Sequence, residues 1–260
     1  MSYRDSSTGY KGVTYGAGAM ITLGLGFVLH TCSTVASMGP PATPAAVEEQ
    51  MVSDPRTGLL FRTIKRTYPD EFDAIRDDVA SRAKAGATES ELKLLVRDDL
   101  MQAAQRHQQD ILQAPHQQFA AYRRAEIAIV EAIRSTNPQL CARYVMQGSL
   151  AVDEGQPFPK DQAIEFQRLS WEAEASGRDT PAHRVIAKPG PADVRALLAG
   201  MTANGLSQQQ LHSFSATGAM QLATPDDQCR IGLAFLHAVN DLPGDHGDSV
   251  YAFIAQQKPK

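Results

Sequence analysis

One stretch of the chain, residues 12–38, contains no Lys, Arg, Asp or Glu, and it constrains the fold more than any other feature. The stretch is long enough to cross a bilayer, whereas its strongly apolar centre, Ala17 to Leu29, spans only about 13 residues and fits a signal peptide better. From the length of the whole uncharged run we expect a transmembrane anchor. The alternative is a signal segment, with Thr34 and Ala36 as the small residues of an imperfect cleavage site.

The charges on either side of this segment predict its orientation. Arg4 and Lys11 precede it, and no Lys or Arg follows before Arg56. Because Lys and Arg beside a membrane segment favour the cytoplasmic side, residues 1–11 are expected to be a short cytoplasmic N-terminus. The rest is then extracytoplasmic, and periplasmic in a Gram-negative bacterium. A soluble cytoplasmic protein with a buried first segment remains open, and it requires reduced cysteines.

Small residues recur every four positions in the segment, at Gly18, Thr22 and Gly26. This spacing lets two membrane helices approach closely. Residues 12–38 are thus the expected membrane contact and a candidate contact for a homo-oligomer. The glycines do not match a dinucleotide-binding loop, because their spacing is not G-x-G-x-x-G and no strand pattern precedes them.

The remaining chain divides into a predicted linker and a predicted domain. Residues 39–54 begin with GPPATPAA and are expected to be an extended linker. Residues 55–260 show helical spacing of apolar residues nearly throughout, and the chain is poor in aromatic residues. They predict an all-α, bundle-like domain of about seven to nine helices, with a candidate internal boundary at residues 148–159. The only expected strand is HRVIA, residues 183–187.

Local signals place several of these helices. TESE, residues 88–91, is a capping box that begins a helix. Pro115 must break or kink this helix. AEIAIVEAI, residues 125–133, is apolar on most sides and is expected at the centre of the bundle. Trp171, the only tryptophan, shares a helix face with Ile164.

Two of the three cysteines occupy similar positions. Cys141 and Cys229 each lie in the first turns of a helix that opens with a capping residue and a proline. In an oxidising compartment they are expected to form a disulfide, which would stabilise the fold by about 4 kcal/mol and often by less. Two separate buried thiols and a redox-active pair are the alternatives. Cys32 would then be the one cysteine outside the disulfide.

The composition excludes some functional classes. The chain has 25 Lys plus Arg against 29 Asp plus Glu, which gives no reason to expect a nucleic-acid partner. It contains no H-E-x-x-H, G-x-S-x-G or phosphate-binding motif, so no catalytic residue, cofactor or metal ligand is assigned. GDHGDS, residues 244–249, is interpreted as a solvated loop. His107 and His237 are expected to be structural.

These patterns predict a membrane-tethered extracytoplasmic helical protein that acts as a structural or protein-binding module, with a partner in the cell envelope. An enzymatic function is the alternative, namely an extracytoplasmic hydrolase with a noncontiguous site. Such a site would use His246 with Asp245 and Asp248.

Overall fold

The structure is a computed structural model that describes residues 43–148, 156–216 and 218–256. In these ranges the protein is all-helical, with twelve helices and no strand. The predicted membrane segment at residues 12–38, with Gly18, Thr22 and Gly26, lies outside them. No helix in the described ranges is long and apolar enough to cross a membrane.

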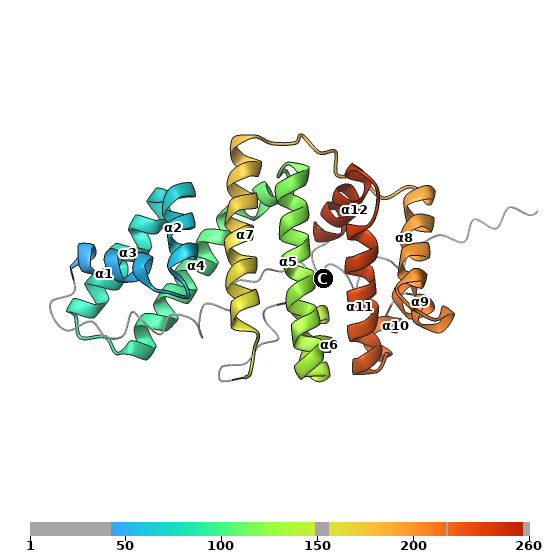
Figure 1. The fold of residues 1–260 in the computed structure, drawn as a ribbon, viewed down its shortest axis with the longest axis horizontal. Helices are drawn as coiled ribbons and strands as arrows, with labels where there is room; N and C mark the ends of the chain where they lie inside the picture. Colours follow the sequence, from blue (N-terminus) through green and yellow to red (C-terminus); the bar gives the residue numbers. More distant parts are fainter. Residues whose placement is uncertain (1–42, 149–155, 217, 257–260) are drawn as a thin grey trace, which may run out of the picture.

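The first four helices form one end of the molecule (Figure 1). They are α1 Pro44–Ser53, α2 Gly58–Thr67, α3 Pro69–Lys84 and α4 Glu89–Ile111. The other eight are α5 His116–Thr136, α6 Pro138–Gln147, α7 Lys160–Asp179, α8 Pro191–Ala203, α9 Gln208–Ser215, α10 Ala219–Leu222, α11 Pro225–Asn240 and α12 Asp245–Ala255.

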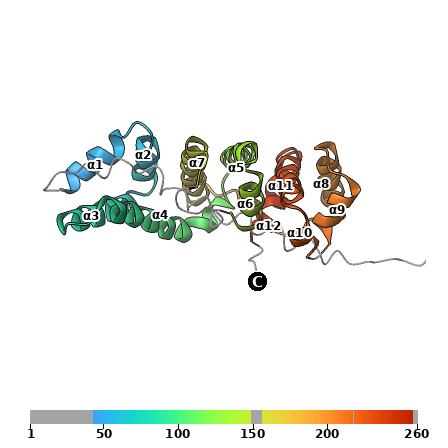
Figure 2. The ribbon, with the colours of Figure 1, turned by 90° about the horizontal axis from the view of Figure 1, so that it is seen from below.

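The helices form an elongated array with two layers (Figure 2). In one layer the order of packed neighbours is α2, α7, α5, α11 and α8, and helices such as α3, α4 and α12 lie in the other. This order differs from the order in the chain, because α7 lies between α2 and α5. The middle of the array is thus built from segments that are distant in sequence.

Helix α7 contributes to two separate apolar cores. Ile164 and Trp171 pack with α1 to α4, whereas Phe166 and Ala173 pack with α5, α6 and α8 to α12. We call α1–α4 the N-terminal region and α5, α6 and α8–α12 the C-terminal region. The two cores are divided along α7.

The predicted linker is partly helical. Pro44–Ser53 forms α1, whose N-cap Thr43 accepts a hydrogen bond from the Ala46 N–H. Val47 and Met51 are four residues apart and fully buried, so this part of residues 39–54 is packed against the domain. The expectation of an extended segment is wrong here, because two apolar residues suffice to bury one face of a short helix.

Two further expectations are also wrong. Residues 183–187 form no strand, because the side chain of Gln113, and not a second strand, is hydrogen-bonded to the main chain of Arg184. Within residues 55–260 the described ranges contain eleven helices, α2 to α12, which is more than the predicted seven to nine. Among the additions are the short helix α10 and the helix α12, the latter where a solvated loop was expected.

The local signals are confirmed. The Thr88 Oγ1 accepts from the Glu91 N–H at 3.4 Å, while the Glu91 carboxylate accepts from the Thr88 N–H at 2.7 Å. Ile129 and Ile133 of α5 are fully buried. Trp171 is buried in the N-terminal core together with Ile164.

Candidate functional site

The structure brings Cys141 and Cys229 to disulfide distance. Their Sγ atoms are 1.94 Å apart and their Cα atoms 5.4 Å apart, and both residues are fully buried. The expected N-caps of the two helices are present: the Asn137 side chain accepts a hydrogen bond from the Leu140 N–H, and the Thr224 side chain accepts one from the Asp227 N–H. The pair joins α6 to α11 in the C-terminal region.

Close helix packing supports this contact. A Cβ atom at Gly232 of α11 would lie 2.4 Å from a methyl carbon of Val145 in α6. Because only a residue without a side chain permits this approach, Gly232 sets the spacing at which the two cysteines meet.

GDHGDS is not a solvated loop. Asp245–Ala255 forms α12, and Asp248 within it has no solvent exposure. Its Oδ1 accepts a hydrogen bond from the Arg123 Nη2 at 2.6 Å, and its Oδ2 accepts from the Arg184 Nη2 at 2.8 Å. The His116 Nδ1 lies 3.0 Å from the same Oδ2. We call these four residues the Asp248 centre.

The Asp248 centre joins α12, α5 and the segment before α8, and further hydrogen bonds of its arginines reach α11 and the residues after α4. Arg123 also donates to the carbonyl oxygen of Val239 in α11, at 3.3 Å. Arg184 donates to the carbonyl oxygen of Ala114, at 3.1 Å, and its guanidinium lies 4.7 Å from the centre of the Phe119 ring. Buried charges need such partners, since an unpaired charge in the interior is strongly unfavourable.

Cation binding at this centre is poorly supported. Ligand atoms of His116, Asp245 and Asp248 lie within 4.8 Å of one another. However, both oxygens of Asp248 already accept hydrogen bonds from arginines, and two guanidinium charges oppose a cation nearby. The arrangement is chemically suited to fixing α12, the start of α5 and the segment before α8.

The residues of the hydrolase hypothesis have different partners. His246 is largely exposed, and its Nδ1 lies 2.8 Å from the Oδ1 of Asp193. Asp193 in turn caps α8 by accepting from the Gly190 N–H. Asp248 is paired with Arg123, Arg184 and His116, so Asp248 and His246 bind different residues.

The two histidines that were expected to be structural, His107 and His237, are each paired with a carboxylate. The Nε2 of His107 lies 3.0 Å from Glu71, and its ring packs on Tyr68 at a centroid distance of 4.2 Å. The Nε2 of His237 lies 3.1 Å from Glu131 at the surface. These positions agree with a structural role for both.

Two carboxyl groups in the core were not singled out from the sequence. Glu126 of α5 is 1 % exposed and accepts a hydrogen bond from the Tyr251 hydroxyl at 2.6 Å. Burial raises the pKa of Glu126 to about 7, against the opposing effects of that hydrogen bond and the charge of Arg123. Burial also raises the pKa of Glu174 in α7 well above its ordinary value. Glu126 lies within the mostly apolar run of residues 125–133, whereas Glu174 shares its helix face with Ser170, which donates to it at 3.3 Å.

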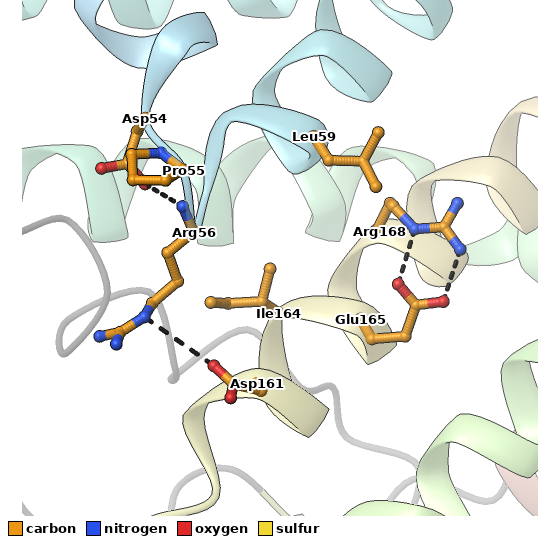
Figure 3. A pocket seen from close by; sticks show the side chains of 8 residues that line it. All are labelled: Asp54, Pro55, Arg56, Leu59, Asp161, Ile164, Glu165 and Arg168. Carbon is orange, nitrogen blue, oxygen red and sulfur yellow. Dashed lines mark hydrogen bonds and ion pairs between the residues drawn. The ribbon is translucent and has the colours of Figure 1, made fainter.

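An open pocket of about 610 Å³ lies between the α1–α2 turn and the first half of α7 (Figure 3). It is lined by Asp54, Pro55, Arg56, Leu59, Asp161, Ile164, Glu165 and Arg168. We call it the α2–α7 pocket. Asp54 holds the turn that forms its edge, because its Oδ1 accepts from the Arg56 N–H and the Thr57 hydroxyl.

The charges of the α2–α7 pocket are paired within it. Arg56 lies 3.8 Å from Asp161, and Arg168 donates two hydrogen bonds to Glu165, at 2.7 and 2.6 Å. Figure 3 shows the side chain of Leu59 near Arg168, and Leu59 is 52 % exposed. A phosphate site would concentrate unpaired cations and a metal site unpaired carboxylates. The pocket shows neither, and an exposed apolar side chain with a polar rim is typical of protein contacts.

Comparison of the chain with protein-family models, with curated proteins and with solved structures found no match.

Proposed function

We propose that the protein is a membrane-tethered extracytoplasmic binding module that holds a partner protein of the cell envelope at the α2–α7 pocket. The observation that carries this proposal is the half-exposed Leu59 beside paired charges. A partner's apolar side chain would gain contact area there without separating an ion pair. Specificity would come from the polar rim.

Two features support the proposed location. The uncharged segment at residues 12–38 offers a membrane anchor. The distance between Cys141 and Cys229 suits a disulfide, which persists in oxidising compartments such as the periplasm. The hydrolase alternative lacks comparable support, because His246 and Asp248 bind different partners.

The location is tested by alkylating thiols in full-length protein from an expressing bacterium, with and without prior reduction. We expect two of the three thiols to react only after reduction and the intact mass to retain residues 1–38. Three thiols that react without reduction would contradict extracytoplasmic residence.

The binding site is tested with two matched substitutions of exposed leucines. Leu59→Asp places a charge in the α2–α7 pocket, whereas Leu222→Asp places the same charge on α10, where the leucine is 88 % exposed. We expect Leu59→Asp to weaken partner binding by about tenfold or more, equivalent to about 1.4 kcal/mol. Leu222→Asp should leave it unchanged. Partner binding is measured by cross-linking in the envelope followed by quantification of the cross-linked partner. Equal binding by the two variants, at equal thermal stability, would reject the pocket as the contact.

A further inference from the structure

The segment between α7 and α8, residues 180–190, crosses one end of the array without forming a helix (Figure 1). We call it the strap. Its one non-glycine residue with positive φ is His183, at 50°. This turn precedes the run from Arg184 to Ala187, in which partly buried and exposed residues alternate, and Lys188 after it is exposed as well. Such alternation is typical of an extended chain that lies on a surface.

One side of the strap is held firmly by Gln113, which follows α4. The Arg184 N–H donates to the Gln113 Oε1 at 2.7 Å, and the Gln113 Nε2 donates to the Arg184 carbonyl oxygen at 3.2 Å. The Ala182 N–H donates to the Gln113 carbonyl oxygen at 2.8 Å. The amide of Gln113 thus satisfies both main-chain groups of Arg184, as a neighbouring strand would. The ion pair between the Arg184 side chain and Asp248 also holds Arg184 in place.

The other side of the strap has no such partner. Along an extended chain the main-chain groups of successive residues point to opposite sides, so those of Val185 and Ala187 point away from Gln113. In the described part of the chain, no hydrogen bond involves the main chain of either residue. Val185 is 79 % exposed, while Ile186 between them packs against the C-terminal core.

We propose that this outer edge, at Val185 and Ala187, binds an extended segment of a partner polypeptide, which pairs with the strap as an added β-strand. The strap is already ordered by Gln113 and Arg184, so binding would require little further loss of chain entropy. The added strand would supply the hydrogen-bond partners that the two residues lack.

The charge of the strap indicates the chemistry of the partner. Residues 180–190 contain His183, Arg184 and Lys188 but no Asp or Glu. Arg184 is paired with Asp248, whereas Lys188 is exposed and has no ion pair within the described ranges. An acidic side chain opposite Lys188 would therefore stabilise the complex. The strap of a second copy would bring no such acidic group, which favours a different polypeptide.

This site is separate from the α2–α7 pocket. The pocket lies at the first half of α7 and the strap follows the end of that helix, which has 20 residues and is about 30 Å long. A substitution at one site should leave binding at the other unchanged, so the two proposals can fail independently.

The test uses a displayed library of random ten-residue peptides, selected on the full-length chain. We expect selected peptides to alternate apolar and acidic residues. Ala187→Pro removes one outward N–H and should weaken their binding at least tenfold, as measured by fluorescence anisotropy. Ala187→Ser keeps this N–H and is the matched control, with unchanged affinity. Lys188→Glu should weaken binding as well.

A second readout does not depend on how the proline variant folds. Selected peptides should lose binding when the main-chain nitrogens of alternate residues, those that face the strap, are methylated. In the complex with the unmethylated peptides, amide hydrogen exchange at Val185 and Ala187 should slow. The proposal is overturned if no selected peptide distinguishes Ala187→Pro from Ala187→Ser, or if exchange at the two amides is unchanged on binding.

Discussion

The two regions of the molecule use charge in different ways. In the N-terminal region the ion pairs lie at the surface, as between Lys65 and Glu48 or between Arg106 and Glu71. In the C-terminal region the pairs of Asp248 with Arg123 and Arg184 are buried. An exposed pair contributes about 0.2 to 1 kcal/mol and weakens with salt. A buried pair contributes little net stability when intact, yet losing one member is strongly destabilising.

The two regions also differ in the kind of contact that joins their distant segments. Helices α1 to α4 pack on one another and on Ile164, Trp171 and Ala175 of α7 through apolar side chains. The C-terminal region is held by a cysteine pair 88 residues apart and by an ion pair 125 residues apart. Its substitutions should therefore have the larger effects.

The largest expected effect follows from Asp248→Asn. This change leaves Arg123 and Arg184 buried without a counter-ion, and it should lower the free energy of unfolding by about 3 to 5 kcal/mol. Urea unfolding followed by circular dichroism measures the loss. Glu48→Gln in the N-terminal region is the control and should cost no more than about 1 kcal/mol. Similar losses for both variants would remove the distinction between the regions.

The next effect concerns the cysteine pair. Replacing Cys141 and Cys229 together by alanine should destabilise the C-terminal region by up to about 4 kcal/mol. Trp171 is the only tryptophan and lies in the N-terminal core, so its fluorescence reports that region. We expect the circular-dichroism midpoint to fall further than the fluorescence midpoint. Coincident midpoints would mean that α7 couples the two cores into one cooperative unit.

A smaller effect should appear in the pH dependence. The pKa of Glu126 rises from an ordinary value of 4.5 to about 7 in the folded state. Between these values the folded protein retains a proton that the unfolded chain has released, so the free energy of unfolding should fall as pH rises from about 4.5 to 7. The loss is on the order of 3 kcal/mol at most.

The control for this effect is Glu126→Gln, which cannot ionise. Its stability should depend less on pH over the same interval, as measured by urea unfolding at several pH values. If the wild type and this variant show parallel curves, Glu126 does not titrate in the interval, and the core of the C-terminal region is not sensitive to pH through this residue.

The smallest effect compares one cap from each region. Thr88→Ala and Thr224→Ala each remove a side-chain oxygen that accepts an N–H at a helix start, and each should cost about 1 kcal/mol. Thermal unfolding should show Thr88→Ala lowering the Trp171 fluorescence midpoint more than Thr224→Ala does. The reverse order would contradict the assignment of α4 and Trp171 to one region.

Several elements could be predicted because their signals are local. The capping box at Thr88, the prolines that open α6 and α11, and the apolar run around Ile129 act within a few residues of the backbone that they shape. The positions of Cys141 and Cys229 also follow from such signals. Their proximity was an inference from compartment and chain entropy, which the geometry supports.

Other elements could not be predicted, because their cause lies in distant residues. Helix α12 contains Gly247 and two aspartates near its start, and this composition is typical of a polar turn. It is stable because Asp248 meets two arginines and Tyr251 meets Glu126. The α2–α7 pocket likewise requires α7 to lie beside α2, although about ninety residues separate the two helices in the chain.

The sequence by itself determined that this protein is helical, where several helices begin and end, and which faces are apolar, since backbone capping and side-chain periodicity act over one or two turns. Only the tertiary structure decided that α7 is shared by two cores, that Gln113 occupies the place of a second strand beside Arg184, and that Asp248 is buried between Arg123 and Arg184. These are contacts between segments far apart in the chain, and they depend on which helices pack together.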